Sequence, residues 1–186
     1  MKKIGIITIC DYTNYGNRLQ NYSLQEVLKS LGFYVETIVN IPSEETKNIN
    51  PMILLKKIKS MPLQVFIANS CSRIKNELTK RKKELLLRKK ALKDFTSKYI
   101  KETGFIISRE EIPFNLLEEY DYFIAGSDQI WNPIYRNGSP IDFLRFAPSH
   151  KRVAYAASFG ISHIPPKYQE SYKKWLSEFH RLSVRE

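Results

Sequence analysis

The segment KIGIITICDYTNYGNRLQNYSLQEVLKSLGFYVETIVNI, residues 3–41, contains one complete β-α-β unit. Residues 3–9 are a nearly unbroken β-branched run, which is typical of a parallel strand buried on both faces. After a polar loop, apolar residues recur at the spacing of one helix face, at Leu24, Val27, Leu28 and Leu31. Gly32 ends this helix, and residues 33–41 resume the strand pattern until Pro42 stops it. This order predicts two parallel strands joined by a crossover helix.

The rest of the chain repeats the alternation of strand and helix. Residues 120–126 and 152–160 are apolar runs that each end in glycine, and both are predicted strands. A helix is expected from about Pro166 to His180, and LSVRE at residues 182–186 opens a further strand. We therefore expect an α/β fold, with an open, mainly parallel Rossmann-like sheet that carries helices on both faces.

A poorly patterned segment and a long basic helix separate the two halves of this pattern. Prolines interrupt residues 42–70, for which we predict a loop with a short helix near 52–60. A long helix is expected over residues 71–98. Its apolar face repeats every seven residues at Leu78, Leu85, Leu92 and Tyr99, with Ile74 and Phe95 beside them. Residues 71–93 hold ten Lys and Arg but two Glu, so they carry eight of the eleven surplus positive charges.

Length and composition fit one soluble domain. With 186 residues and 42% hydrophobic content, residues 1–186 are expected to form a single Rossmann-like domain. No run approaches the roughly 18 consecutive apolar residues that cross a bilayer, and the N-terminus has no signal-peptide pattern. Cys10 and Cys71 stand alone, without the spacing of a metal site or a disulfide framework. These features predict a cytoplasmic protein that binds no metal.

Four loops are expected at the carboxyl ends of the strands, where ligands bind in open parallel sheets. They are residues 11–17, 126–133, 158–163 and 184–186. The first holds Asn14, Gly16 and Asn17 at a helix start, whose amide groups suit an anion or a sugar hydroxyl. The alternative is that the two asparagines only cap the helix. The loop lacks the glycine-rich fingerprints of dinucleotide and P-loop sites, which disfavours those ligands.

The second loop, GSDQIWNP, mixes hydrogen-bonding side chains with an aromatic ring. The residues of interest are Ser127, Asp128, Gln129, Trp131 and Asn132. Such a mixture suits a carbohydrate, because sugar hydroxyls need polar partners and sugar ring faces need apolar ones. The alternative is that Asp128 is a turn or cap residue and that Trp131 belongs to the core.

Four strings of the sequence carry a family resemblance. They are NYGNRLQNYSLQEVLKSLG at 14–32, YDYFIAGSDQIWNP at 120–133, KRVAYAASFG at 151–160 and SVRE at 183–186. In this order they resemble the signature of the polysaccharide pyruvyl transferases. The resemblance implies a two-domain enzyme of glycosyltransferase-B-like architecture that transfers an enolpyruvyl group from phosphoenolpyruvate to a sugar, usually as a cyclic ketal across two hydroxyls. Phosphoenolpyruvate is then the donor substrate, and no cofactor is expected.

The resemblance also implies that residues 1–186 are the N-terminal half of the enzyme. The family's Ser-Phe-His motif, with its proposed general-acid histidine, has no counterpart in this sequence, so the catalytic residues are expected in a second half. Within this half, the resemblance assigns donor binding to Arg185 of the V-R-E string. Arginine can hold two oxygens of a carboxylate or phosphate at once, whereas lysine offers a point charge. The alternative is a surface ion pair with Glu186.

The expected partner is a sugar or a lipid-linked saccharide acceptor in cell-surface polysaccharide biosynthesis. Two other functions stay open, namely a non-catalytic module that binds sugars or an anionic surface, and a fragment of a glycosyltransferase of the same architecture. Residues 71–93 lack interleaved aromatic side chains, so no nucleic-acid partner is expected. Their charge suits peripheral association with an anionic membrane at its inner face. The alternative is a solvated helix face.

Overall fold

The computed structural model describes residues 1–41 and 70–185, with side chains described for 1–41 and 79–185. The short helix predicted near residues 52–60 lies outside the described residues. The strands are β1 (Lys3–Ile7), β2 (Tyr34–Asn40), β3 (Glu102–Ile107), β4 (Tyr122–Gly126), β5 (Arg152–Ala157) and β6 (Arg181–Val184). They form one sheet in the order β3-β2-β1-β4-β5-β6, and every neighbouring pair is parallel. The prediction of an open parallel sheet is confirmed, in the strand order of Rossmann folds.

The sequence analysis missed strand β3. This strand lies at the edge of the sheet, and its residues are exposed or half-buried in an irregular order up to the buried Ile107. Gly104 interrupts the pattern and Ile106 is exposed, so the segment lacks the continuous apolar run of a central strand. Only pairing with β2 identifies it as a strand.

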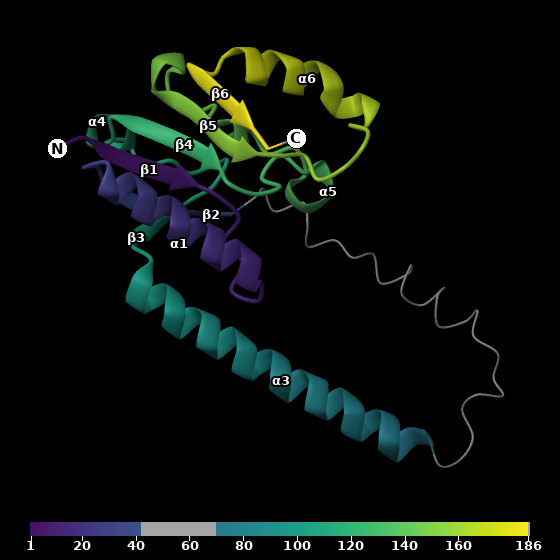
Figure 1. Ribbon diagram of the computed structural model, residues 1–186. Helices are drawn as coiled ribbons and strands as arrows, with labels where there is room; N and C mark the ends of the chain where they lie inside the picture. The colour runs from purple at the N-terminus through teal and green to yellow at the C-terminus, as the bar shows by residue number, and fades with distance from the viewer. Residues whose placement is uncertain (42–69, 186) are drawn as a thin grey trace.

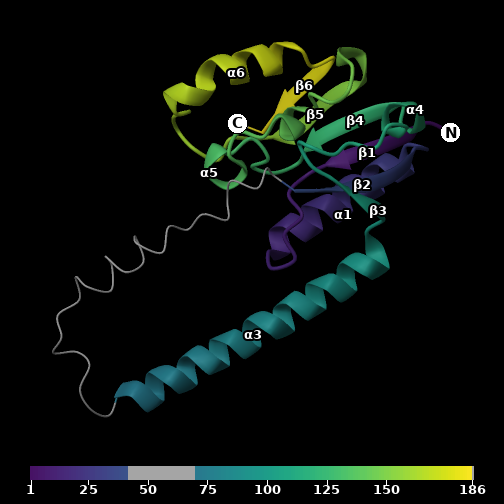
Figure 2. The ribbon, with the colours of Figure 1, turned by 180° about the vertical axis from the view of Figure 1, so that it is seen from behind.

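Helices cover both faces of the sheet, as predicted (Figures 1 and 2). On one face lies α1 (Tyr15–Ser30), with α3 (Ser70–Tyr99) beside it. The other face carries α4 (Leu116–Glu119), α5 (Pro133–Arg136), α6 (Pro166–Ser177) and 3-10 turns at Pro140–Phe143 and Ser149–Lys151. Because side chains alternate along a strand, Ile4 and Ile6 pack towards α1, whereas Ile7 belongs to the larger core on the other face.

Helix α1 does not bury the apolar stripe that its sequence predicts. Leu24 and Leu28 lie in the core, but Val27 is 53% exposed and Leu31 is 66% exposed. The buried face is mostly polar and consists of Asn17, Arg18, Asn21, Leu24, Gln25 and Leu28. The prediction was wrong here because this face meets hydrogen-bonding groups of β2 and of the segment before β3.

The long basic helix is confirmed, but its apolar face packs against the domain only near its end. Tyr22 of α1 makes edge-on ring contacts with Phe95 and Tyr99, at centroid distances of 5.7 and 6.0 Å. Leu92 is buried, whereas Leu85, one heptad earlier, is 51% exposed. Most of the described helix therefore extends away from the sheet, as Figures 1 and 2 show.

Candidate functional site

The candidate site lies where the order of the strands reverses. From β1 the chain moves outward to β2 and β3, and it then returns to place β4 on the other side of β1. The loops that leave β1 and β4 must therefore diverge to opposite faces, which opens a crevice at the carboxyl edge of the sheet. The loop after β1 leads into α1, and the loop after β4 leads into α5.

A pocket of about 550 Å³ occupies this crevice. It is lined by Ile9, Asp11, Asn14, Asn17, Asp128, Gln129, Tyr135 and Arg136. Four residues proposed from the sequence thus come together from two loops more than a hundred residues apart. Asp11, Tyr135 and Arg136 join them without having been singled out.

Asn17 connects the two loops. Its backbone N–H donates to Asn14 Oδ1 at 3.2 Å, so Asn14 caps α1 and also lines the pocket. Its side-chain Nδ2 donates to Asp128 Oδ2 at 3.0 Å, and its Oδ1 accepts from the backbone N–H of Asp11 at 3.1 Å. Asn17 is 3% exposed, so these bonds fix its orientation at the floor of the pocket.

Arg18 is a supporting residue that the sequence analysis missed. Its side chain is fully buried, and its Nη1 pairs with Glu102 Oε1 at 2.8 Å. Its Nη2 donates to Ile9 O at 2.8 Å and to Asn17 Oδ1 at 2.7 Å. The only signal in the sequence was its place in the string at residues 14–32, because a helical pattern predicts an arginine to be exposed.

Glu102 also accepts a hydrogen bond from Tyr12, whose Oη donates to Glu102 Oε2 at 2.8 Å. Burial and this hydrogen bond raise the pKa of Tyr12 above its usual range, so the phenol stays protonated and remains a donor. The guanidinium of Arg18 lies over the Tyr12 ring, 5.1 Å from its centroid. The loop after β1 is thus anchored to β3 through one buried charged network.

Two carboxylates face the pocket. Asp128 accepts from the backbone N–H of Gln129 at 2.7 Å through Oδ1, in addition to the bond from Asn17. Asp11 accepts from Thr13 N and Oγ1, at 2.8 and 2.7 Å, through Oδ1 only. Carboxylate and amide oxygens gathered in this way are suited to accept hydrogen bonds from hydroxyl groups.

The pocket's arginine is already paired. Arg136 Nε donates to both oxygens of Asp142, at 3.1 and 3.0 Å, and its Nη2 donates to Asn40. Burial raises the pKa of Asp142, while the guanidinium of Arg136 opposes that rise. Because both groups are buried and joined to each other, Arg136 contributes a wall of the pocket and little net positive charge.

Gln129 owes its position to a glycine on the next loop. Gly160 has φ +61°, and a Cβ atom built there would lie 2.1 Å from Gln129 Oε1. Asn132 Nδ2 donates to the same oxygen at 3.1 Å. Any larger residue at position 160 would displace the Gln129 side chain from this place.

Trp131 and Asn132, which the sequence also proposed, do not line this pocket. Trp131 is 1% exposed, stacks on Phe143 at 5.5 Å between centroids, and donates from Nε1 to Asp142 O at 2.9 Å. Asn132 is equally buried and caps α5 by accepting from Ile134 N at 3.0 Å. The core alternative for Trp131 is therefore correct, because its indole N–H finds a carbonyl inside the protein.

Gly16 and Ser127 also lie outside the lining of the pocket. Gly16 is exposed in the first turn of α1. Ser127 lines a separate hollow of about 280 Å³ on the α1 side of the sheet, together with Leu19, Val27 and Tyr155. Of the residues that the sequence proposed in these two loops, Asn14, Asn17, Asp128 and Gln129 line the pocket.

Arg185 lies just after β6, and Ser158 joins it to the loop of Asp128. Nη2 of Arg185 donates to Ser158 Oγ at 3.2 Å, and the backbone N–H of Ser158 donates to Asp128 O at 3.0 Å. Arg185 is exposed. One serine therefore links an exposed guanidinium to the loop that carries a pocket carboxylate.

The family model for polysaccharide pyruvyl transferase matches residues 14–186. The chain belongs to this family. No curated protein and no solved structure gives a significant match to it. The matched region begins at the cap of α1 and includes Asp128, Gln129, Ser158 and Arg185, so these parts of the site belong to the region that defines the family.

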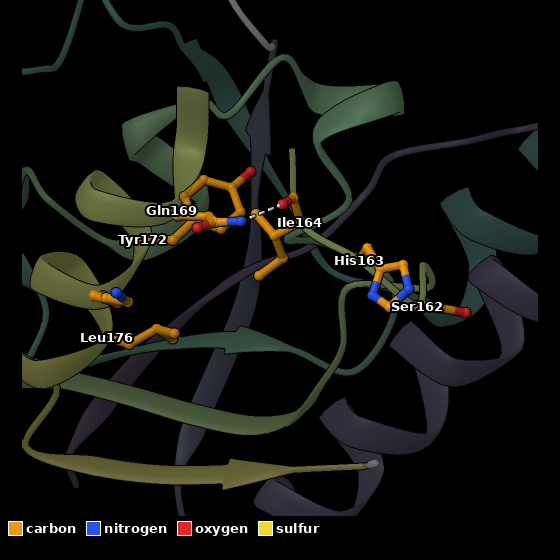
Figure 3. A pocket seen from close by; sticks show the side chains of 7 residues that line it. Ser162, His163, Ile164, Gln169, Tyr172 and Leu176 are labelled. Atoms are coloured by element: carbon orange, nitrogen blue, oxygen red, sulfur yellow. Dashed lines mark hydrogen bonds between the residues drawn. The ribbon is translucent and has the colours of Figure 1, made fainter. Parts of the chain in front are cut away.

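The structure has a second hollow of about 470 Å³ beside α6, shown in Figure 3. Tyr172 and Leu176 give it an apolar wall, and Gln169 Nε2 donates to Ile164 O at 2.9 Å. His163 lies at its other end, away from Tyr172 (Figure 3). This hollow lacks the convergence of buried polar groups found at the strand reversal, so the pocket there is the better candidate.

No metal centre is evident where the structure describes side chains. Within residues 1–41 and 79–185, no three His, Cys, Asp or Glu side chains are placed to hold a metal ion. The two pocket carboxylates instead take hydrogen bonds from Asn17, Gln129 and Thr13. The site therefore combines hydrogen-bond acceptors in the pocket with the guanidinium of Arg185, which Ser158 links to the loop of Asp128.

Proposed function

We propose that this domain is the N-terminal half of a cytoplasmic enzyme that transfers the enolpyruvyl group of phosphoenolpyruvate to two hydroxyls of a sugar, giving a pyruvate ketal for cell-surface polysaccharide. The pocket at the strand reversal binds the acceptor, and Arg185 binds the donor. The general acid belongs to a second domain. Membership of the polysaccharide pyruvyl transferase family supports this reaction class.

One observation carries the proposal. Ser158 accepts from Arg185 through Oγ and donates to Asp128 O through its backbone, so the donor arginine and the acceptor loop meet at the same edge of the sheet. Pyruvyl transfer needs both substrates within bonding distance of each other. The two hydrogen bonds of Ser158 support such an arrangement, because they link the Arg185 guanidinium to the loop of Asp128.

The pocket and Arg185 carry opposite charges, so they suit different substrates. Phosphoenolpyruvate carries a carboxylate and a phosphate, and the carboxylates of Asp11 and Asp128 would repel it. A neutral sugar can instead donate its hydroxyls to those carboxylates and to the amide oxygen of Gln129. Arg185 is an exposed arginine at this edge, and its fork matches two oxygens of the donor at once.

The proposed reaction balances without a redox cofactor. The two sugar hydroxyls each form a bond to the central carbon of the donor and lose one proton each. One proton is added to the methylene carbon, which becomes a methyl group, and the other leaves with the phosphate. In this proposal Asp128 accepts a hydrogen bond from a reacting hydroxyl, and the bond from Asn17 Nδ2 to Asp128 Oδ2 supports that role by orienting the carboxylate.

The test is phosphate release by the two-domain protein at varied donor and acceptor concentrations. Arg185→Lys keeps the charge but loses the fork, so we expect the KM for phosphoenolpyruvate to rise roughly 10- to 100-fold, as for loss of a charged hydrogen bond. Asp128→Asn should raise the acceptor KM and leave the donor KM nearly unchanged. Arg181→Lys, at an exposed position at the start of β6, is the matched control and should change neither constant.

The outcomes separate the alternatives. An unchanged donor KM in Arg185→Lys would return Arg185 to a surface role. Saccharide binding without phosphate release would indicate a non-catalytic module, and release of a nucleotide from a nucleotide sugar would indicate a glycosyltransferase. Turnover by residues 1–186 alone would contradict the assignment of the general acid to a second domain.

A further inference from the structure

Residues 79–91 of α3 form an exposed arm. Every residue from 79 to 91 is exposed, and the first buried side chain after them is Leu92. Figure 2 shows the helix leaving the sheet from its C-terminal end. The arm contributes little to the core, so its composition is not explained by packing.

The arm carries a face made of lysines around one leucine. At 100° per residue, Lys82, Lys83, Leu86, Lys89 and Lys90 fall on a single face, which we call the lysine face. The side turned towards α1 holds Leu92 and Phe95, and Arg88 on that side lies over the Tyr15 ring at 4.3 Å from its centroid. Over residues 82–90 the lysine face therefore points away from α1. One turn further on, Lys93 lies on the same face, and its Nζ lies over the Tyr12 ring at 5.7 Å from the centroid.

Apolar side chains are exposed among these charges. Leu86 is 60% exposed and Leu87 is 59% exposed, and lysines lie one helical turn from each of them. Adjacent leucines that stay exposed to water gain nothing from burial. On a helix that lies on a membrane, such side chains insert below the level of the lipid phosphates. The lysines then meet the lipid phosphates, to which their stems can extend.

We propose that the lysine face docks on an anionic phospholipid surface, with Leu86 and Leu87 entering the interface. The binding is peripheral, because no helix in the described part of the chain is long and apolar enough to cross a membrane. A nucleic acid fits less well, since residues 79–91 hold no aromatic side chain for stacking on bases, and Phe95 and Tyr99 beyond them pack on Tyr22. This inference does not depend on the proposed reaction.

The experiment is co-sedimentation of the full chain with vesicles of phosphatidylcholine alone or mixed with phosphatidylglycerol. We expect binding only to the mixed vesicles, and weaker binding as salt rises, because the attraction is screened. A variant with Lys82→Glu, Lys83→Glu, Lys89→Glu and Lys90→Glu should lose at least about 100-fold in partition coefficient, as expected for several charges near an anionic surface. Circular dichroism should show unchanged helix content.

The matched control reverses four exposed lysines elsewhere, Lys2, Lys167, Lys173 and Lys174, and so changes the net charge equally. It should keep most of the binding. Leu86→Ser with Leu87→Ser should bind several-fold more weakly at every salt concentration, because it removes insertion but not charge.

Three results would overturn the proposal. They are equal binding to neutral vesicles, equal loss in the control variant, and displacement of the protein from vesicles by low concentrations of an RNA or DNA oligonucleotide. The last result would assign the lysine face to nucleic acid. None of these results bears on phosphate release, so the two proposals fail separately.

Discussion

Helices α1 and α3 lie side by side but use their polar residues in opposite ways. Helix α1 buries Arg18 and Gln25 completely and leaves Val27 and Leu31 exposed. Helix α3 exposes its charges along with Leu86. Most buried polar groups of α1 have partners on other elements, such as Glu102 for Arg18, although Asn21 Nδ2 has no hydrogen-bond partner among the described residues. Burial thus follows the availability of partners as much as hydropathy.

The largest expected effect is the loss of the buried cation. Arg18→Met should lower the free energy of unfolding by about 3–5 kcal/mol, because Glu102 would stay partly buried without its partner. Urea denaturation followed by tryptophan fluorescence measures it. Arg88→Met on α3 is the matched control and should cost less than about 1 kcal/mol, the range of an exposed cation–π contact. Similar losses in the two variants would remove the distinction between the helices.

A smaller effect is expected within α1 itself. Gln25 Nε2 donates to Thr37 Oγ1 and to Lys101 O, both at 2.8 Å, and Gln25 Oε1 accepts from Lys101 N at 3.0 Å. Gln25→Leu should cost about 1–3 kcal/mol by leaving these buried groups unpaired. Val27→Gln should change stability by less than about 0.5 kcal/mol, as for an exposed position. If denaturation curves show a larger loss of stability for Val27→Gln than for Gln25→Leu, the buried face of α1 is the apolar one that the sequence predicted.

The third effect is a pH dependence that a buried carboxylate should have and the arm should not. Burial tends to raise the pKa of Glu36, but the hydrogen bonds from Lys3 and Tyr120, with the charges of Lys3 and Lys101, lower it below its usual value. Because the folded pKa lies below the unfolded one, Glu36 contributes stability above the unfolded pKa of about 4.3. That contribution is lost as pH falls through the folded pKa.

Denaturation midpoints measured from pH 7 downward test this sign. Glu36→Gln should lower stability at pH 7 and flatten the fall on acidification, whereas Glu84→Gln on the exposed arm should leave the whole profile unchanged. If Glu36→Gln and the wild-type protein show the same dependence of stability on pH, the partners of Glu36 do not stabilise its charged form.

Much of the fold could be read from periodicity. The apolar runs of β1, β2, β4 and β5 were predicted because strands buried on both faces need continuous apolar residues. Edge strand β3 has no such need, so its sequence carried no comparable signal. The loops that form the pocket were also predicted, because strand ends fix where a parallel sheet can bind ligands.

Periodicity could not predict which residues of these loops line the pocket. In the loop after β4, Asp128 and Gln129 line the pocket, while Trp131 turns into the core. Local sequence left two alternatives open for Trp131, a ring that faces a sugar and a core residue. The difference comes from Asp142 O, which receives the indole N–H, and from Gly160, which makes room for Gln129.

The sequence by itself determined the α/β class, the places where strands end and the ordered strings that mark the family. Only the tertiary structure decided which polar side chains are buried and which face a ligand. The physical reason is that these choices depend on partners far along the chain. Arg18 finds Glu102 across 84 positions and Asn17 finds Asp128 across 111, so neither pairing leaves a trace in local periodicity.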